Sequence, residues 1–432
     1  MWLGNFLFFS IHQIYFDNKY NFSIGNFNFD NTSHVKELYF LMITINLAIL
    51  LGTIISNYFI SFKYSNIKYK ISNSLEKFKP FLLLFLIFII ILIYYLNKNF
   101  IFFDYYYFAE YTLSPAISSF LKWFFLFGFT SIFCILINLN EKKNFLYKIF
   151  SISLFQEFLF YNSILSRGCI FNSIAILIGL YVKKAKDFYS IKIFSFFLFF
   201  IISLFLINFY ILIYERGGSN HENLKKYRNI EKNNQSKLNN NINIKNLVTR
   251  ASFKNDKKPK QTIIFNFQEF KTRSNQIFFS FKNRIFGIDS LMVLIGEKNK
   301  SFKLFKNAIN EKFNPGKKSF FDEIRNKNKS NTATNLTMPS ITGFLYYSGS
   351  KLFVFCGLIL IIILMNLFEK LNIMLNSNII LTSLLSQLIA YRLWHFGYAP
   401  NNTYKFILAI LLSIFLHYLI QKFLVKFKIL QK

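Results

Sequence analysis

Long apolar segments alternate with shorter polar and basic ones over most of the chain. The clearest of them carry few or no charged residues: Leu38–Phe62, Pro80–Leu96, Ile117–Leu139, Ile191–Tyr214, Leu352–Phe368 and Tyr404–Leu424. A helix rises about 1.5 Å per residue, so about 20 apolar residues cross the roughly 30 Å of hydrocarbon in a bilayer. The pattern predicts an all-α membrane protein, a polytopic helical bundle of about six to nine spans.

The C-terminal part adds one further, moderately apolar segment, Ile379–Phe396. It is separated from Tyr404–Leu424 by Gly397–Asn402, where Gly, Pro and Asn favour a reversal of the chain. We therefore expect these two segments to form antiparallel helices that are joined by a tight turn.

Residues 149–182 allow two interpretations. They are too long for one untilted crossing and about long enough for two short ones, and Glu157 and Ser166–Gly168 interrupt their apolar run. One interpretation is an interfacial helix at 149–165 followed by a single crossing at 168–182. The other is a re-entrant hairpin that turns near Ser166–Gly168. The single crossing puts the large basic insert on the same side as the basic short loops but leaves Lys183, Lys184 and Lys186 on the other side, and a hairpin does the reverse. We prefer the single crossing, because the insert carries more charge.

The chain divides into four regions by composition. These are an N-terminal apolar segment with a polar loop (1–37), an N-terminal transmembrane region (38–214), a basic Asn- and Lys-rich insert (215–341) and a C-terminal transmembrane region (342–432). The insert holds 26 Lys and Arg against 10 Asp and Glu. Its first part, 219–260, is of low complexity, and this predicts a partly disordered extramembrane segment.

One stretch of the insert, 261–313, has the pattern of a small ordered module. Apolar density and alternation predict short strands in QTIIFNFQEF, QIFFSFK and LMVLIG. The sequence SFKLFKNAINEKF has the apolar spacing of an amphipathic helix. Residues 314–341 return to an Asn-, Ser- and Lys-rich loop.

The amount and placement of charge limit the classes of function that the chain can have. The formal net charge is +31 at pH 7, and the basic residues lie between the apolar segments. This placement favours loops on the positive-inside side and anionic headgroups over nucleic acid. Cys134, Cys169 and Cys356 are isolated, and the chain has neither a P-loop nor a Gly-rich dinucleotide motif. We expect a non-catalytic protein with no cofactor, no metal, no nucleic acid and no small-molecule substrate.

Arg392 is the sharpest candidate for chemistry, because ionisable residues within membrane spans are costly and mark functional sites. His395 follows it at i+3, and we expect His417 and Gln421 opposite it across the hairpin. The Arg392–Leu393 dipeptide resembles that of subunit a of ATP synthases, although the Asn and Gly-His of that family are missing at the expected offsets. The resemblance implies a proton-translocating subunit with Arg392 as the charge barrier. The alternative is that Arg392 and His395 are interface anchors near a helix end.

Glu157 is the second candidate. Together with Lys122 on the preceding span it resembles the Lys–Glu pairs of the antiporter-like subunits of respiratory complex I, which relay protons. Those subunits need far more spans than this chain has. The alternative is structural pairing between Glu157 and Arg167, or a simple place at the membrane interface.

The overall composition points to a source. The chain has 60 Phe and 25 Tyr in 432 residues and is rich in Ile, Asn and Lys, all residue types with A/T-rich codons. Its N-terminus, MWLGNFLFFSIHQIYF, has no Lys or Arg and a single Ser, whereas a transit peptide is rich in Arg and Ser. In these features the chain resembles the products of ciliate mitochondrial open reading frames, the "ymf" class. The resemblance implies a multi-pass subunit of an oxidative-phosphorylation complex in the mitochondrial inner membrane.

The expected function is therefore that of a structural or accessory subunit of a respiratory-chain complex or supercomplex. Its expected partners are other subunits and membrane lipids, with a lipid such as cardiolipin bound through Lys-rich rims. A proton-translocating subunit similar to subunit a, with Arg392 as its charge barrier, is the alternative.

Overall fold

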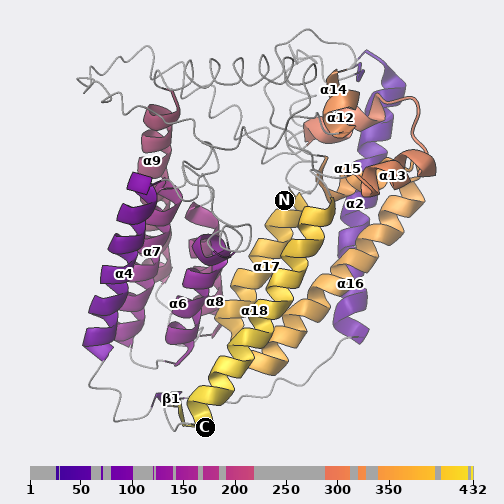
Figure 1. Ribbon diagram of the computed structural model, residues 1–432. Coiled ribbons are helices and arrows are strands. Elements are labelled where there is room, and N and C mark those ends of the chain that lie inside the picture. Colours follow the sequence, from indigo (N-terminus) through magenta and orange to yellow (C-terminus); the bar gives the residue numbers. More distant parts are fainter. Residues whose placement is uncertain are drawn as a thin grey trace, which may run out of the picture.

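The structure is a computed structural model in which nearly all the described residues lie in helices (Figure 1). It describes residues 26–28, 30–59, 70–71, 79–100, 120, 123–139, 143–163, 169–183, 191–217, 288–311, 320–326, 339–394, 400–426 and 430–431. The long elements are α2 (Thr32–Phe59), α4 (Lys79–Phe100), η1 (Phe124–Gly128) with α6 (Phe129–Leu139), α7 (Lys143–Ser163), α8 (Cys169–Lys183), α9 (Ile191–Gly217), α16 (Lys351–Asn376), α17 (Ile379–Trp394) and α18 (Pro400–Lys426).

The short elements are α12 (Ile288–Ile295), α13 (Phe302–Ile309), α14 (Phe320–Asn326), α15 (Ser340–Tyr346) and the strands β1 (Lys70–Ile71) and β2 (Leu430–Gln431). The two strands pair in antiparallel register and join the connection after α2 to the C-terminal end of the chain. Helices α12 to α15 gather around the first turns of α2 and α16, and we call them the cap (Figure 1).

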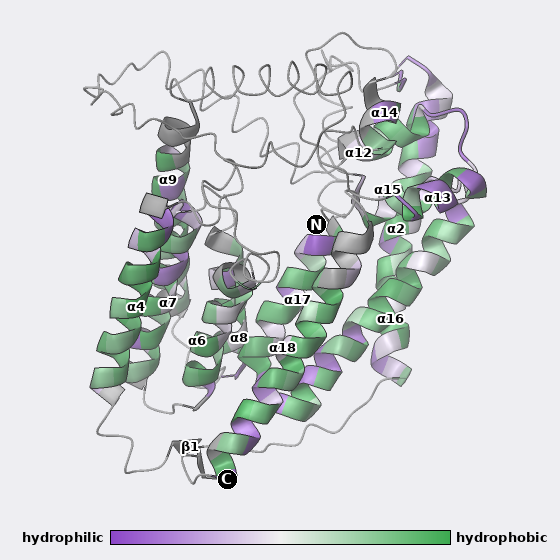
Figure 2. Ribbon diagram, in the orientation of Figure 1, coloured by the Kyte–Doolittle hydropathy of each residue, from purple (hydrophilic) through white to green (hydrophobic). Residues whose placement is uncertain are grey.

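Among the described residues, five helices are long and apolar enough to cross a membrane: α2, α4, α9, α16 and α18. Helices α6, α8 and α17 are also apolar but shorter. Hydrophobic residues cover these helices along most of their length (Figure 2). The chain is therefore a multi-pass helical membrane protein, and this part of the sequence prediction is confirmed.

Consecutive long helices run in alternating directions (Figure 1). Helices α8 and α17 are antiparallel, because Phe171 near the start of α8 meets Tyr391 near the end of α17, whereas Gly179 farther along α8 lies against Ile380 at the start of α17. Between these contacts the Ser383 hydroxyl donates to the Ala175 carbonyl at 2.7 Å. As a result, the helix ends that flank 60–78, 140–142 and 184–190 share one end of the bundle with the β1–β2 pair (Figure 1). We call this the basic end; the cap lies at the opposite end.

Helix α7 lies lengthwise in the bundle and packs on α4, α6, α8 and α9. Phe150, for example, meets Phe197 of α9 edge-to-face with 4.9 Å between ring centroids. Helices α7 and α8 form an antiparallel pair inside the bundle, an arrangement closer to the hairpin interpretation than to the interfacial helix preferred for 149–165. Glu157 had suggested an interruption of the apolar run, but it points between the helices, where it is 1% exposed.

Two clusters of buried side chains hold the molecule together. One joins α4, α6, α7, α8, α9, α17 and α18, and the other joins α2 and α16 to the cap. Glycines allow close helix approach in both, as small residues do in membrane bundles. A Cβ at Gly179 would lie 2.8 Å from the Ile380 Cα, and one at Gly52 would lie 3.2 Å from the Ile362 side chain.

The cap corrects two predictions about the insert. The sequence LMVLIG, predicted as a strand, lies in helix α12, and Leu291–Ile295 is buried on every side. A short apolar run that is buried all round has no period by which a strand and a helix can be told apart. The amphipathic helix in SFKLFKNAINEKF is confirmed as α13, whose N-terminus is capped by Ser301: its hydroxyl accepts from the Leu304 N–H at 3.2 Å.

The boundary between insert and C-terminal region also moves. Helix α15 (Ser340–Tyr346) crosses the predicted boundary at 341 and is almost wholly buried in the cap. Helix α14 (Phe320–Asn326) falls in 314–341, which was predicted as loop. The disorder predicted for 219–260 and the strands predicted between 261 and 282 lie outside the described residues.

A salt bridge fastens the cap to the second turn of α2. The Lys300 ammonium lies 3.2 Å from the Glu37 carboxylate and donates to the Ile295 carbonyl at 2.9 Å. The Tyr346 hydroxyl donates to the same carboxylate. Burial, reinforced by this hydrogen bond to a charged acceptor, raises the pKa of Tyr346 well above its usual range. The cap is thus held on α2 by a salt bridge and hydrogen bonds as well as by the covalent connections of the chain.

Candidate functional site

A buried histidine joins α18 to α6. His417 is 4% exposed; its Nδ1 lies 2.5 Å from the Ser413 carbonyl oxygen, and its Nε2 lies 2.9 Å from the Ser131 hydroxyl. The Ser413 hydroxyl in turn accepts from the Trp123 indole N–H at 2.7 Å. Each of these contacts satisfies a polar group away from water, which a membrane interior requires.

The protons around His417 can be arranged in two ways. A carbonyl oxygen only accepts, so Nδ1 carries a proton and donates it to Ser413. The Ser131 hydroxyl has one proton and two acceptors in reach, because the Gly128 carbonyl lies at 2.7 Å. If Ser131 donates to Nε2, the imidazole is neutral; if it donates to Gly128, Nε2 must donate as well and the ring is an imidazolium. The same heavy-atom positions therefore accommodate either protonation state.

Glu157 lies between α7 and α8. It is 1% exposed, and its Oε2 accepts from both the backbone N–H (3.0 Å) and the hydroxyl (2.5 Å) of Ser173. The neighbouring Asn172 side chain donates to the Tyr161 hydroxyl at 3.4 Å. The second carboxylate oxygen of Glu157, Oε1, has no hydrogen-bond partner among the described residues. The pairings named for Glu157 at the sequence level, with Lys122 or Arg167, lie outside the described residues.

One hydrogen bond connects the surroundings of His417 with those of Glu157. The Thr130 hydroxyl of α6 donates to the Gln156 side-chain oxygen of α7 at 3.3 Å. Thr130 is next to Ser131 in the chain, and Gln156 is next to Glu157. The resulting series, which we call the polar track, crosses four helices through the interior of the bundle: His417, Ser131, Thr130, Gln156, Glu157 and Ser173.

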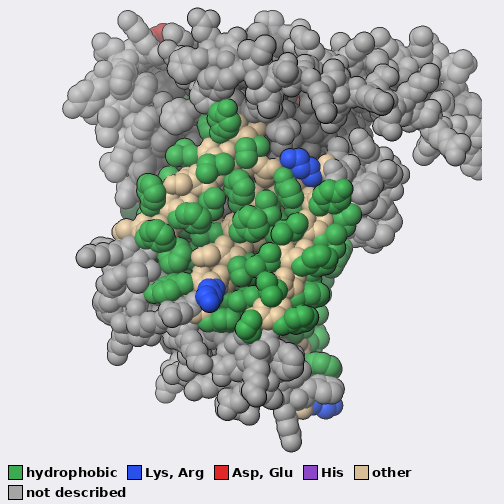
Figure 3. All heavy atoms as spheres, turned by 90° about the vertical axis from the view of Figure 1, so that its left-hand side faces the viewer, with side chains coloured by type: hydrophobic (Ala, Val, Ile, Leu, Met, Phe, Trp, Pro, Cys, Tyr) green, Lys and Arg blue, Asp and Glu red, His purple; other side chains and the backbone are tan. Residues whose placement is uncertain are grey.

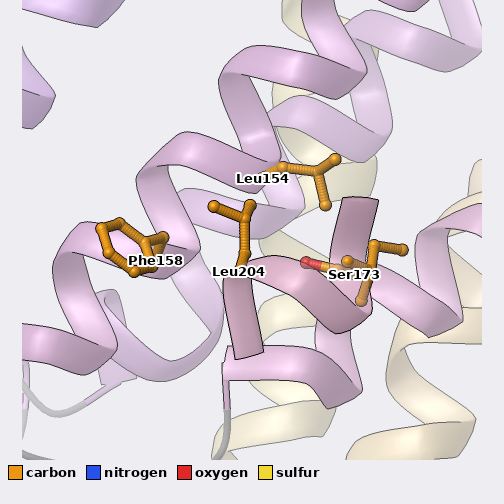
Figure 4. A pocket seen from close by; sticks show the side chains of 5 residues that line it. Leu154, Phe158, Ser173 and Leu204 are labelled. Atoms are coloured by element: carbon orange, nitrogen blue, oxygen red, sulfur yellow. The ribbon is translucent and has the colours of Figure 1, made fainter. Parts of the chain in front are cut away.

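A small cavity lies beside the Ser173 end of the polar track, between α7, α8 and α9 (Figure 4). Its volume is about 10 Å³, and apolar side chains such as Leu154, Phe158 and Leu204 form the rest of its wall. A single water needs about 10–15 Å³ and two or more polar partners. The cavity therefore has room for about one water but little to hold it.

A second polar cluster closes the turn between α16 and α17. Asn376 donates to the Asn372 side-chain oxygen at 2.8 Å, and Asn372 donates to the Thr382 hydroxyl at 2.7 Å. Asn378 caps α17 by accepting from the Leu381 N–H at 3.0 Å. All the asparagines named are buried. This cluster fixes the reversal of the chain, and its role is structural.

Arg392 does not face His417. It lies in the last turn of α17, half-buried, with its guanidinium 5.9 Å from the ring centre of Phe406 on α18. His417 comes 11 residues after Phe406, about 16 Å farther along the helix. Gln421 is one turn beyond His417 and is buried. His395 lies outside the described residues. Arg392 therefore does not lie opposite His417 and Gln421, and the expectation from the sequence is wrong on this point.

Sequence reasoning selected Glu157 and His417 but missed the residues that connect them. Thr130, Ser131 and Gln156 are uncharged, and Gln421 was the one uncharged residue treated as a candidate. The available signal was their position within apolar helices, where an uncharged polar side chain also needs an internal partner. Among the described residues, no group of three or more His, Cys, Asp or Glu is placed to hold a metal ion.

Glu157 orders the α7–α8 contact in this geometry. Replacing it with Leu removes the carboxylate oxygen that accepts from the Ser173 hydroxyl and N–H, and we expect a loss of about 1–3 kcal/mol in stability. Glu157→Gln keeps an acceptor oxygen of the same reach and serves as the matched control, with a small effect. Thermal unfolding of the three proteins in detergent measures the difference. Equal unfolding temperatures for the Leu and Gln variants would show that this hydrogen bond does not order the helix pair.

Comparisons with known proteins supply no role that could be carried over to the polar track. The chain matches no family model, no curated protein and no solved structure among those searched. What the track and the bundle do must therefore be argued from their own residues.

Proposed function

We propose that the chain is an integral subunit of a respiratory-chain complex of the mitochondrial inner membrane, with a structural role in assembly and stability. The observation that carries the structural role is the separation of side chains: polar groups meet inside the bundle, while large apolar residues such as Phe88, Leu360 and Leu412 are more than half exposed on its outside. Such faces fit lipid tails and the helices of neighbouring subunits. The mitochondrial membrane and the respiratory complex come from the compositional resemblance.

The packing of the interior supports a frame rather than a carrier of solutes. The cavity beside Ser173 is about 10 Å³, whereas pockets for small molecules are commonly about 300–1,000 Å³. Other subunits, and bound anionic lipid such as cardiolipin, are the partners that this proposal includes. The chain would order its neighbours by presenting long, rigid helices to them.

We propose further that all nine long helices cross the bilayer, with η1 and α6 counted as one. Connections at the basic end are rich in Lys: 60–78 has four Lys and one Glu, and 184–190 has two Lys and one Asp. At the cap end, 101–119 has two acidic residues and no Lys or Arg. Short loops set orientation by the positive-inside rule, while a long insert is not counted. The basic end would then face the matrix, and the insert would lie on the opposite side, contrary to the sequence-level preference.

This topology predicts which loops share a side. Single-cysteine variants Ser74→Cys and Lys186→Cys, in a background without the native cysteines, should react with a membrane-impermeant thiol reagent from the same side. Four crossings, α4, α6, α7 and α8, separate these two positions. Tyr398→Cys, between α17 and α18, is the control for the other side. If Ser74→Cys and Lys186→Cys react from opposite sides, α7 does not cross the membrane.

The alternative function is proton translocation by a component similar to subunit a of ATP synthases, with Arg392 as the charge barrier. One observation favours proton chemistry: His417 and Glu157 are brought into one polar track. The proposed barrier has less support. Arg392 lies over Phe406 near a helix end, about 16 Å along α18 from His417. The structural role is therefore the better supported of the two.

One experiment tests both functions. On native gels of solubilised membranes, the 51.4 kDa chain should migrate with a respiratory complex. The Arg392→Ala variant should co-migrate equally, because the cation–π contact with Phe406 that it loses is partly exposed and worth about 0.5–1 kcal/mol. Proton-coupled turnover of the complex should stay near normal, and Arg392→Lys is the matched control. Migration as a free chain would contradict the structural proposal, and an assembled complex that has lost turnover in Arg392→Ala would favour the alternative.

A further inference from the structure

An apolar groove lies on the outer surface of the bundle, where α4 and α7 begin. Its volume is about 620 Å³, within the range of pockets that hold small molecules. Leu83, Leu84 and Ile87 of α4 form one wall, and Tyr147, Lys148 and Ile152 of α7 form the other. The groove is open along the outside of the molecule, so an occupant enters it from the surrounding medium.

The surface around the groove is the kind that faces lipid. Hydrophobic side chains cover the described part of this side of the molecule, and basic side chains stand only near its margins (Figure 3). Lys98 ends the apolar stretch of α4 at the cap end, and Lys148 lies level with Leu83 at the basic end. The 15 residues between Leu83 and Lys98 span about 22 Å, and the two lysines reach outward from either end of this belt.

The groove combines apolar walls with a positive charge at one end. Lys148 is exposed, and no carboxylate among the described residues pairs with it. The helices also begin with basic residues, Lys79 and Lys143. Tyr147 adds an aromatic side chain with a polar tip, a residue type that prefers the level of the lipid headgroups. An apolar chain attached to a negatively charged group is complementary to this arrangement.

We propose that the groove between α4 and α7 binds an anionic phospholipid, with an acyl chain against Leu83, Leu84 and Ile87 and the headgroup phosphate at Lys148. The ammonium group is a compact, strongly charged donor and suits a phosphate oxygen. The proposal rests on the proposed function in one respect, which is that α4 and α7 cross the membrane. It goes beyond the proposed function by naming the lipid-binding site, its level in the bilayer and the charge of the lipid headgroup.

Native mass spectrometry of the purified protein tests the site, with phosphatidylglycerol as the anionic probe and phosphatidylcholine as the zwitterionic one. The wild type should bind phosphatidylglycerol more tightly. Lys148→Gln should weaken phosphatidylglycerol binding about fivefold, the effect of about 1 kcal/mol for one lysine at a lipid surface, and leave phosphatidylcholine binding unchanged. Ser151→Trp, which fills the groove, should reduce binding of both lipids. Lys98→Gln, at the other end of the belt, is the matched control and should bind as the wild type does.

Three outcomes would overturn the proposal. If Lys148→Gln and the wild type bind phosphatidylglycerol equally, the groove does not recognise the anionic headgroup. If Ser151→Trp binds both lipids normally, the groove is not the site. If a photo-crosslinker at Ser151 in the native complex attaches to a protein subunit instead of lipid, a partner helix occupies the groove. Failure of the underlying topology is distinguished separately, because a Ser151→Cys thiol would then react with a membrane-impermeant reagent.

Discussion

A bilayer offers no hydrogen-bonding partner to a buried polar group, and the rest of this structure depends on that constraint. Polar side chains on the long helices turn toward one another: His417 toward Ser131, Glu157 toward Ser173, and Asn372 toward Thr382. The outward faces are left to Phe, Leu and Ile. The helices are held in register by these few directed contacts, because apolar packing against lipid alone does not select one arrangement.

The same constraint explains how α7, a helix with a carboxyl group, would cross the membrane in the proposed topology. Helix α7 is less apolar than its neighbours and was the element on which the two topologies differed. Its Gln156 bonds to Thr130 and its Glu157 to Ser173, and this offsets part of the cost of burying them; Gln156 Nε2 and Glu157 Oε1 have no hydrogen-bond partner among the described residues. Once α7 counts as a crossing, the Lys-rich short connections all fall at one end. The insert and the cap then belong to the opposite end, where Glu37, Lys300 and Tyr346 fasten them.

The apolar segments, the hairpin of α17 and α18 and the helix at Phe302–Ile309 could be predicted from sequence, because each rests on a period or a length. Two points that the sequence analysis did not predict have a physical cause. LMVLIG is buried on all sides, so no period distinguishes a strand from a helix. Glu157 was weighed with charged partners, Lys122 or Arg167, whereas Ser173, which donates to it, is uncharged and lies on the next helix. The wrong expectation that Arg392 faces His417 could have been avoided from the sequence, because a turn centred near residue 400 puts Arg392 opposite Phe406.

The central claim is that α7 lies in hydrocarbon with Glu157 facing inward. A nitroxide spin label at Phe155, which is 44% exposed on the outer face of α7, tests it most directly, with a label at Phe88 of α4 as the lipid-facing reference. The account predicts that oxygen, which concentrates in lipid, relaxes both labels strongly and that a water-soluble nickel chelate hardly affects either. Strong relaxation of the Phe155 label by nickel, with Phe88 still protected, would contradict it.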